Sequence, residues 1–140
     1  MESMSGSTND DPRKLRSLLE RATDLAKKHE VRSVVVGLVA PNGTLGFPEF
    51  IEFLRAALRV EDAIFRMTRE RVVVHLADVD REGARAIIER LLNQFRSEVP
   101  TSHDVEFALS EFEIPPGTAE VSVRDALTTL FSPSDAPTMH

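Results

Sequence analysis

The stretch FRMTRERVVVHLADVDREGARAIIERL, from Phe65 to Leu91, decides the fold of this chain. Its first part contains the end of one short strand-like run, Ala63–Met67, and the whole of a second run, Val72–Leu76. The four polar residues Thr68–Arg71 separate the two runs. Two such runs joined by a short polar segment predict a β-hairpin with a charged tip.

The flanking sequence supplies further elements in an alternating order. Apolar residues recur at helical spacing in four segments, and three of these segments follow residues that cap helices well, Asp11, Asp80 and Ser122. The elements predicted before the hairpin are a helix from Pro12, capped by Asp11, to about Glu30, a strand at Val31–Val39, and a helix from Gly46 and Pro48 to about Arg59 or Val60. Those predicted after it are a helix capped by Asp80 that runs to about Ser97, a strand at Val105–Ile114, and a helix at Val123–Phe131 capped by Ser122.

The inner six elements form a βαββαβ unit, which predicts an α+β fold with a ferredoxin-like core, extended by one helix at each end. Val31–Val39 is β-branched and almost wholly apolar, so we expect it to be an internal strand covered on both faces. We expect residues 11–131 to form one domain between two flexible tails, 1–10 and 132–140.

Composition excludes several classes of function. The 140 residues include no cysteine, so disulfides and thiolate chemistry are excluded. The formal charge of -6 argues against nucleic-acid or membrane partners, and no segment is apolar enough for a signal peptide or a membrane span. We therefore expect a soluble, cytoplasmic protein. The four histidines are scattered and predict no metal site; they are His29, His75, His103 and His140.

The hairpin and the helix after it resemble the segment of diguanylate cyclase domains that carries the GGDEF signature. In that register Arg66 takes the place of the arginine two residues before the signature. The five signature positions hold Thr68, Arg69, Glu70, Arg71 and Val72, and only Glu70 keeps the family's character. The resemblance extends more weakly to the rest of the chain, and it implies a degenerate GGDEF-like domain of bacterial signalling.

The resemblance also implies that the chain is not an enzyme and needs no cofactor. Diguanylate cyclases require divalent metals on GTP, and hence oxygen ligands. The family's first-strand aspartates fall near Leu38–Ala40, which has none. Thr68 and Arg69 add bulk where glycines admit phosphate, and Arg71 places a cation where an acidic ligand is expected. The family's phosphate-contacting lysine falls near Ser134.

A second family feature is retained at matching spacing. Many GGDEF domains carry an inhibitory product site, an Arg-x-x-Asp placed five residues before the signature, together with an arginine on the following helix. Here Arg59 and Asp62 have that spacing, and ungapped counting places the additional arginine at Arg90. Guanidinium groups pair with phosphate and with guanine O6 and N7, and a carboxylate accepts from guanine N1 and N2. These three residues are therefore the candidate site for cyclic di-GMP.

Other interpretations remain open. Arg59 and Asp62 are also typical of a solvated pair at a helix end, and the domain is then a protein interaction or dimerisation module that binds no nucleotide. A protein partner or a homodimer is expected in that case. The nearby arginines, Arg59, Arg66, Arg69 and Arg71, predict one basic cluster that is either a solvated hairpin tip or an anion contact. His75 is expected at a strand edge or an interface, without a catalytic role.

Overall fold

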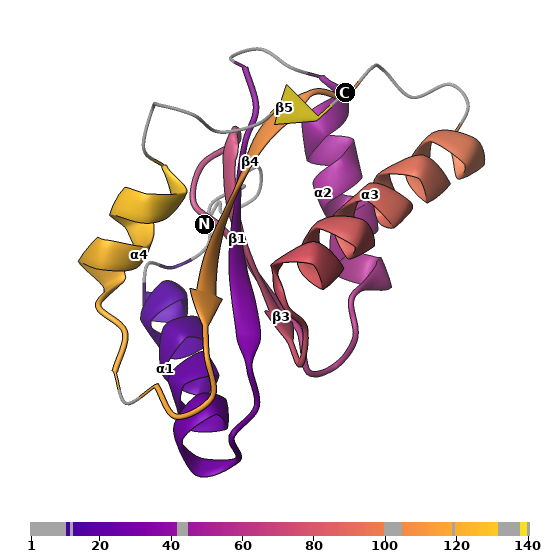
Figure 1. Cartoon of the computed structure of the whole chain (residues 1–140). Helices are drawn as coiled ribbons and strands as arrows, with labels where there is room; N and C mark the ends of the chain where they lie inside the picture. Colours follow the sequence, from indigo (N-terminus) through magenta and orange to yellow (C-terminus); the bar gives the residue numbers. More distant parts are fainter. Residues whose placement is uncertain are drawn as a thin grey trace, which may run out of the picture.

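The computed structural model describes residues 11, 13–41, 45–99, 105–118, 120–131 and 138–139. Four helices and five strands alternate along these residues (Figure 1). In chain order they are α1 (Arg13–Lys28), β1 (Ser33–Val39), α2 (Gly46–Ala57), β2 (Ala63–Arg66), β3 (Arg71–Ala77), α3 (Arg81–Glu98), β4 (Phe107–Ile114), α4 (Val123–Leu130) and β5 (Thr138–Met139).

The five strands form one antiparallel sheet in the order β2-β3-β1-β4-β5. The first four of these strands are those of the predicted βαββαβ unit, so the predicted α+β, ferredoxin-like core is confirmed. β1 pairs with β3 on one side and β4 on the other, with Val36 opposite Val74 and Glu111. The prediction that the first strand is internal is therefore correct.

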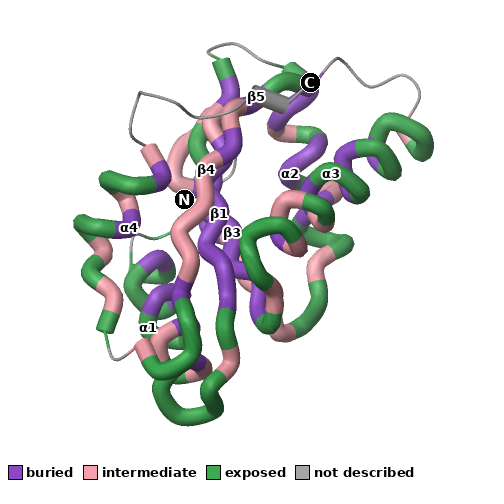
Figure 2. The backbone as a smooth tube through the Cα atoms, in the orientation of Figure 1, coloured by how far each residue is buried: buried purple, intermediate pink, exposed green. Residues whose placement is uncertain are grey.

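Helices cover both faces of the sheet (Figure 1). α2 and α3 pack on one face over a core rich in phenylalanine, in which Phe50 stacks on Phe107 with ring centroids 5.6 Å apart. α1 and α4 pack on the other face around Val35, Val73 and Ile114. Figure 2 shows the central strands buried between the two helical layers, whose outer surfaces are exposed.

The predicted capping residues accept hydrogen bonds from backbone amides at the helix starts. The Asp80 carboxylate accepts a hydrogen bond from the Gly83 amide at 2.8 Å, and the Ser122 hydroxyl accepts one from the Asp125 amide at 3.3 Å. The Asp11 carboxylate accepts one from the Arg13 amide at 2.9 Å. These side chains satisfy amides that have no partner within the first helical turn.

Besides shifts of one or two residues at other element ends, the structure differs from the predicted elements in two places. α2 ends at Ala57, earlier than predicted, because Leu58 is extended and starts the loop into β2. β5 was not predicted: Thr138 and Met139 pair with Ala108 and Phe107 within the stretch expected to be a tail. Among the described helices, none is both long and apolar enough to cross a membrane.

Candidate functional site

The loop between α2 and β2 positions the first two candidate residues. Leu58 closes the helix by donating its amide to the Leu54 carbonyl at 3.0 Å. The chain then turns, and the Asp62 amide donates to the Arg59 carbonyl at 3.0 Å. This turn faces Arg59 and Asp62 towards each other and towards the end of β3 at Ala77.

Arg59 and Asp62 form a two-pronged ion pair. The Asp62 Oδ2 atom accepts from the Arg59 Nε at 2.9 Å and from the Arg59 amide at 3.1 Å. Its Oδ1 atom accepts from the Arg59 Nη2 at 2.9 Å and from the Ala77 amide at 3.1 Å. The Arg59 Nη2 also donates to the Ala77 carbonyl at 2.7 Å. The pair therefore ties the α2–β2 loop to the end of β3.

These contacts use the whole hydrogen-bonding capacity of Asp62. A carboxylate has about four acceptor sites, and protein donors fill four here. The Asp62 side chain is only 3% exposed, whereas the Arg59 side chain is 44% exposed. The hydrogen bond to Asp62 raises the pKa of Arg59, so the guanidinium stays charged. In this arrangement Asp62 holds Arg59 in place.

The other edge of the Arg59 guanidinium is held less closely, in a side chain that is partly exposed. Its Nη1 atom has a single described partner, the exposed Glu61 carboxylate at 3.5 Å. Asp78 adds a further negative charge nearby. Val60, at the apex of the same loop, is 91% exposed. The loop therefore presents a guanidinium edge, a carboxylate and an apolar side chain together.

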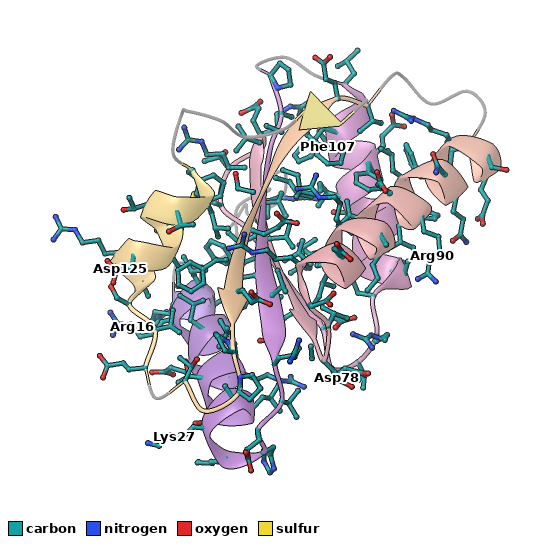
Figure 3. The ribbon with its side chains drawn as sticks, in the orientation of Figure 1. Arg16, Lys27, Asp78, Arg90, Phe107 and Asp125 are labelled. Atoms are coloured by element: carbon teal, nitrogen blue, oxygen red, sulfur yellow. The ribbon has the colours of Figure 1, made fainter. Side chains whose placement is uncertain are left out.

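Arg90 lies on α3 and is exposed. Figure 3 shows its side chain extending from α3 on the side away from the sheet, well separated from Asp78 at the end of β3. Within the described residues, Arg90 makes no hydrogen bond or ion pair, and no contact joins it to the other two candidates. The structure therefore brings Arg59 and Asp62 together and leaves Arg90 apart.

The tip of the hairpin is a tight turn closed by its own backbone. The Met67 and Thr68 amides both donate to the Arg71 carbonyl, at 2.9 and 3.1 Å. The Thr68 hydroxyl accepts from the Glu70 amide at 3.3 Å. Neither Arg69 nor Glu70 has a positive φ, so this turn does not require glycine. The residues at the signature positions therefore form a turn that residues other than glycine can adopt.

Contacts from β1 and α4 close the same end of the sheet. The Ala40 amide donates to the Glu70 carbonyl at 2.8 Å, which joins the turn to the chain leaving β1. The Arg71 guanidinium lies over the Phe131 ring, 5.6 Å from its centroid. The divalent metal implied by the resemblance does not fit here, because Leu38 and Ala40 are buried apolar residues and Arg71 is a cation.

The predicted basic cluster is wrong. Arg59 lies before β2 and Arg69 lies beyond it, so the strand, about 13 Å long, separates them. Arg66 is 7% exposed and donates to the Glu52 carboxylate at 2.7 Å. The Arg71 guanidinium lies over the Phe131 ring. Although these arginines are close in sequence, they lie at the two ends of the hairpin and on different faces of the sheet.

The prediction for His75 is also wrong, because β3 lies inside the sheet and His75 is 0% exposed. It pairs with Val35 and Ala63 and faces α1, as does Ser33. Neither ring nitrogen of His75 nor the Ser33 hydroxyl has a hydrogen-bond partner among the described residues. Burial lowers the pKa of His75 to about 4; Asp62 opposes this shift and Arg21 adds to it. The imidazole is therefore neutral near pH 7.

Solved structures identify the fold. The chain is similar to a DGC protein from Thermotoga maritima, with a TM-score of 0.63 and 16% identity over 84% of this chain and 89% of that one. It is similar to PelD from Pseudomonas aeruginosa in complex with c-di-GMP, with a TM-score of 0.61 and 19% identity over 86% of this chain and 44% of that one. No protein-family model and no curated protein sequence matches.

A third similar structure is the GGDEF domain of TpbB (YfiN) from Pseudomonas aeruginosa, with a TM-score of 0.54 and 16% identity over 93% of this chain and 87% of that one. At such identities the likeness shows the fold alone. The chain therefore has the fold of GGDEF domains, as the resemblance of the hairpin implied. It spans less than half of the PelD structure.

Proposed function

We propose that residues 11–131 form a non-catalytic GGDEF-like regulatory domain that binds cyclic di-GMP at the open edge of Arg59, with Arg90 as a second contact. The observation that carries this proposal is the fixed guanidinium of Arg59. Asp62 and the Ala77 carbonyl hold one side of it, while Nη1 has only the Glu61 carboxylate at 3.5 Å as a described partner and the side chain as a whole is 44% exposed. An arginine held in place in the free protein loses little side-chain entropy when it binds a ligand.

The chemistry of the loop suits a guanine nucleotide. The Arg59 edge can donate to guanine O6 or N7 or to a phosphate oxygen. The exposed Glu61 carboxylate, 3.5 Å away, can accept from guanine N1 and N2. Asp62 acts in this proposal by positioning Arg59, since its own acceptor sites are filled. In this proposal the ligand extends from the Arg59 loop to α3, where Arg90, which lies apart from Arg59, supplies a further cation for a phosphate.

The similarity to PelD supports the choice of ligand, because that structure is a complex with c-di-GMP. The hairpin tip supports the absence of catalysis. Where a cyclase needs room for phosphate and oxygen ligands for a metal, this chain has the Ala40–Glu70 hydrogen bond and the Arg71–Phe131 contact. The proposed domain therefore acts by binding at one end of the hairpin only.

Calorimetric titration with cyclic di-GMP tests the ligand. Replacing Arg59 with Ala should weaken binding at least about tenfold, because hydrogen bonds to charged groups contribute about 1.5–3 kcal/mol. The matched control is Arg124→Ala, which removes an exposed arginine from α4 on the opposite face of the sheet. Absence of heat with the wild-type protein at about 500 µM ligand contradicts the proposal.

Product analysis tests the absence of catalysis. Incubation of the protein with GTP and either Mg²⁺ or Mn²⁺ should yield no cyclic di-GMP above a protein-free blank. Product formation that is lost on Arg71→Ala would show that the hairpin tip is catalytic. The outcome is independent of the binding titration.

The exposed side chain of Val60 favours a second candidate function, a protein interaction module that binds no nucleotide. An isolated apolar residue that is 91% exposed on a loop is suited to a protein contact. Sedimentation of the isolated chain tests self-association. A dimer that Val60→Ser dissociates, together with no heat from cyclic di-GMP, would support this function in place of the first.

A further inference from the structure

α1 and the outer strand of the sheet enclose a groove separate from the Arg59 loop. Lys14, Ser17 and Arg21 line it from the exposed side of α1, and Leu18 forms its floor. Ala63 and Ile64 line it from β2. The groove has a volume of about 250 Å³, enough for a few side chains.

The groove lies along the edge of the sheet, because it touches two consecutive residues of β2, Ala63 and Ile64. β2 is the outermost strand on this side, and within the described residues no strand pairs with its outer edge. The groove and the free edge are therefore one surface.

The hydrogen-bond pattern identifies which backbone groups the edge offers. The Met67 amide donates to the Arg71 carbonyl, so Met67 is a hydrogen-bonded position of the antiparallel ladder. Such positions alternate, and Phe65 and Ala63 therefore bond to β3 as well. Ile64 directs its N–H and C=O outwards. An added strand would find a donor and an acceptor at Ile64.

The charge of the groove indicates what would bind. Lys14 and Arg21 are both exposed, and neither forms an ion pair with a described residue. They flank the buried Leu18 on the same stripe of α1, in a protein whose formal charge is -6. Two cations that have no ion-pair partner among the described residues, on either side of an apolar floor, attract an acidic segment that carries one apolar side chain.

We propose that this surface binds an extended acidic segment of a partner protein, which adds to β2 as a further strand. Arg21 follows Lys14 by seven positions along α1, a span of about 10 Å. Acidic residues four apart in a strand lie about 13 Å apart, within reach of the two long cationic side chains. The segment has the pattern acidic-x-apolar-x-acidic, with its apolar side chain over Leu18. Added strands of this kind are a common mode of peptide recognition.

This binding is independent of the proposed cyclic di-GMP site. It uses the α1 side of β2, whereas the guanidinium edge of Arg59 lies in the loop before the strand. Failure of either proposal leaves the other intact, because the two use different residues and different ligands.

A fluorescent heptapeptide with the sequence Ser-Asp-Thr-Val-Thr-Asp-Ser serves as the probe, followed by fluorescence polarisation. The double variant Lys14→Glu/Arg21→Glu should bind it at least about tenfold more weakly, because two attractive charge contacts become repulsive. The double variant Arg16→Glu/Lys27→Glu makes the same change in net charge elsewhere on the exposed surface of α1. That matched control should change the affinity by no more than about twofold.

A peptide with Lys in place of both Asp residues should bind the Lys14→Glu/Arg21→Glu variant and not the wild-type protein. Amide exchange then tests strand addition: the Asp-containing peptide should protect the Ile64 amide, while Phe65 is protected already. The proposal is overturned by no binding up to about 1 mM peptide, by equal losses in both double variants, or by binding without protection of Ile64. A homodimer through β2 that excludes the peptide would identify a second copy as the occupant and also overturn it.

Discussion

The two ends of the β2–β3 hairpin carry opposite chemistry. At the tip end, Met67–Arg71, backbone hydrogen bonds, Ala40 and Phe131 occupy the groups that a GGDEF signature would offer to a nucleotide. At the loop end, Arg59–Asp62, a buried carboxylate fixes an arginine whose outer edge stays open. One hairpin thus combines an end closed by the protein's own contacts with an end that is organised and accessible.

The difference shows that replacement of the signature residues at the tip end need not weaken the Arg59–Asp62 pair at the loop end. The loop end depends on Asp62 and on the Ala77 backbone, and neither lies at the tip. The tip end depends on β1 and α4, through Ala40 and Phe131. Because the two ends use separate supports, substitutions should affect them separately.

Removal of the Asp62 carboxylate should have the largest effect. Asp62→Ala leaves the Ala77 amide and part of the Arg59 guanidinium without partners, and we expect a loss of about 3 kcal/mol in the free energy of unfolding. Urea denaturation measures it. Glu61→Ala, which removes an exposed partner of the same arginine, should cost less than about 0.5 kcal/mol. Equal effects of the two changes would show that Asp62 does not fix the loop.

Acid should weaken the sheet between the two ends through His75. Its pKa is about 4 in the folded protein and about 6.5 when exposed, so the unfolded chain binds the extra proton as the pH falls below about 6.5. Stability is therefore present above that pH and is lost on acidification. We expect His75 to contribute a loss of about 2 kcal/mol between pH 7.5 and pH 5.

The variant His75→Leu isolates this contribution. It fills a similar volume without a titratable group, so its stability should fall less than that of the wild-type protein over the same pH range. Urea denaturation at both pH values gives the difference. Parallel pH profiles for the two proteins would contradict the burial of a neutral imidazole at this position.

A methyl group at Gly37 should disturb the tip end. A Cβ atom there would lie 2.8 Å from the Leu130 Cβ and 3.3 Å from the Leu130 carbonyl oxygen, so α4 must move away from β1. We expect Gly37→Ala to cost about 1–2 kcal/mol, despite the lower entropy of the unfolded chain. Thermal denaturation measures it, with Ser110→Ala on β4 as a control. Unchanged affinity for cyclic di-GMP would sharpen the separation of the two ends.

The sequence was sufficient for the four helices, the first four strands and their βαββαβ order. Apolar periodicity and the Asp80 and Ser122 caps are local, and they were correct. The pairing of Arg66 with Glu52 and the hydrogen bond from the Ala77 amide to Asp62 join residues fourteen and fifteen positions apart, and no local pattern encodes them. The basic cluster failed for this reason.

The burial of His75 and the strand β5 were missed for a related reason. A histidine in a strand is equally compatible with an edge and an interior, and only the order β2-β3-β1 places it inside. β5 has two residues, too few for a periodic signal, and its pairing depends on the outer edge of β4 at Phe107 and Ala108. Such features follow from the assembled sheet.

The contact between Arg71 and Phe131 should have the smallest effect, and it tests whether the tip end is closed by α4. An exposed cation–π contact contributes about 0.5–1 kcal/mol, so Arg71→Ala should lower the free energy of unfolding by that amount. Part of any loss comes from other contacts of each side chain. A double-mutant cycle with Phe131→Leu removes these parts and leaves the coupling between the two residues. A coupling near zero, with each single change still destabilising, would mean that the arginine and the ring stabilise the tip independently.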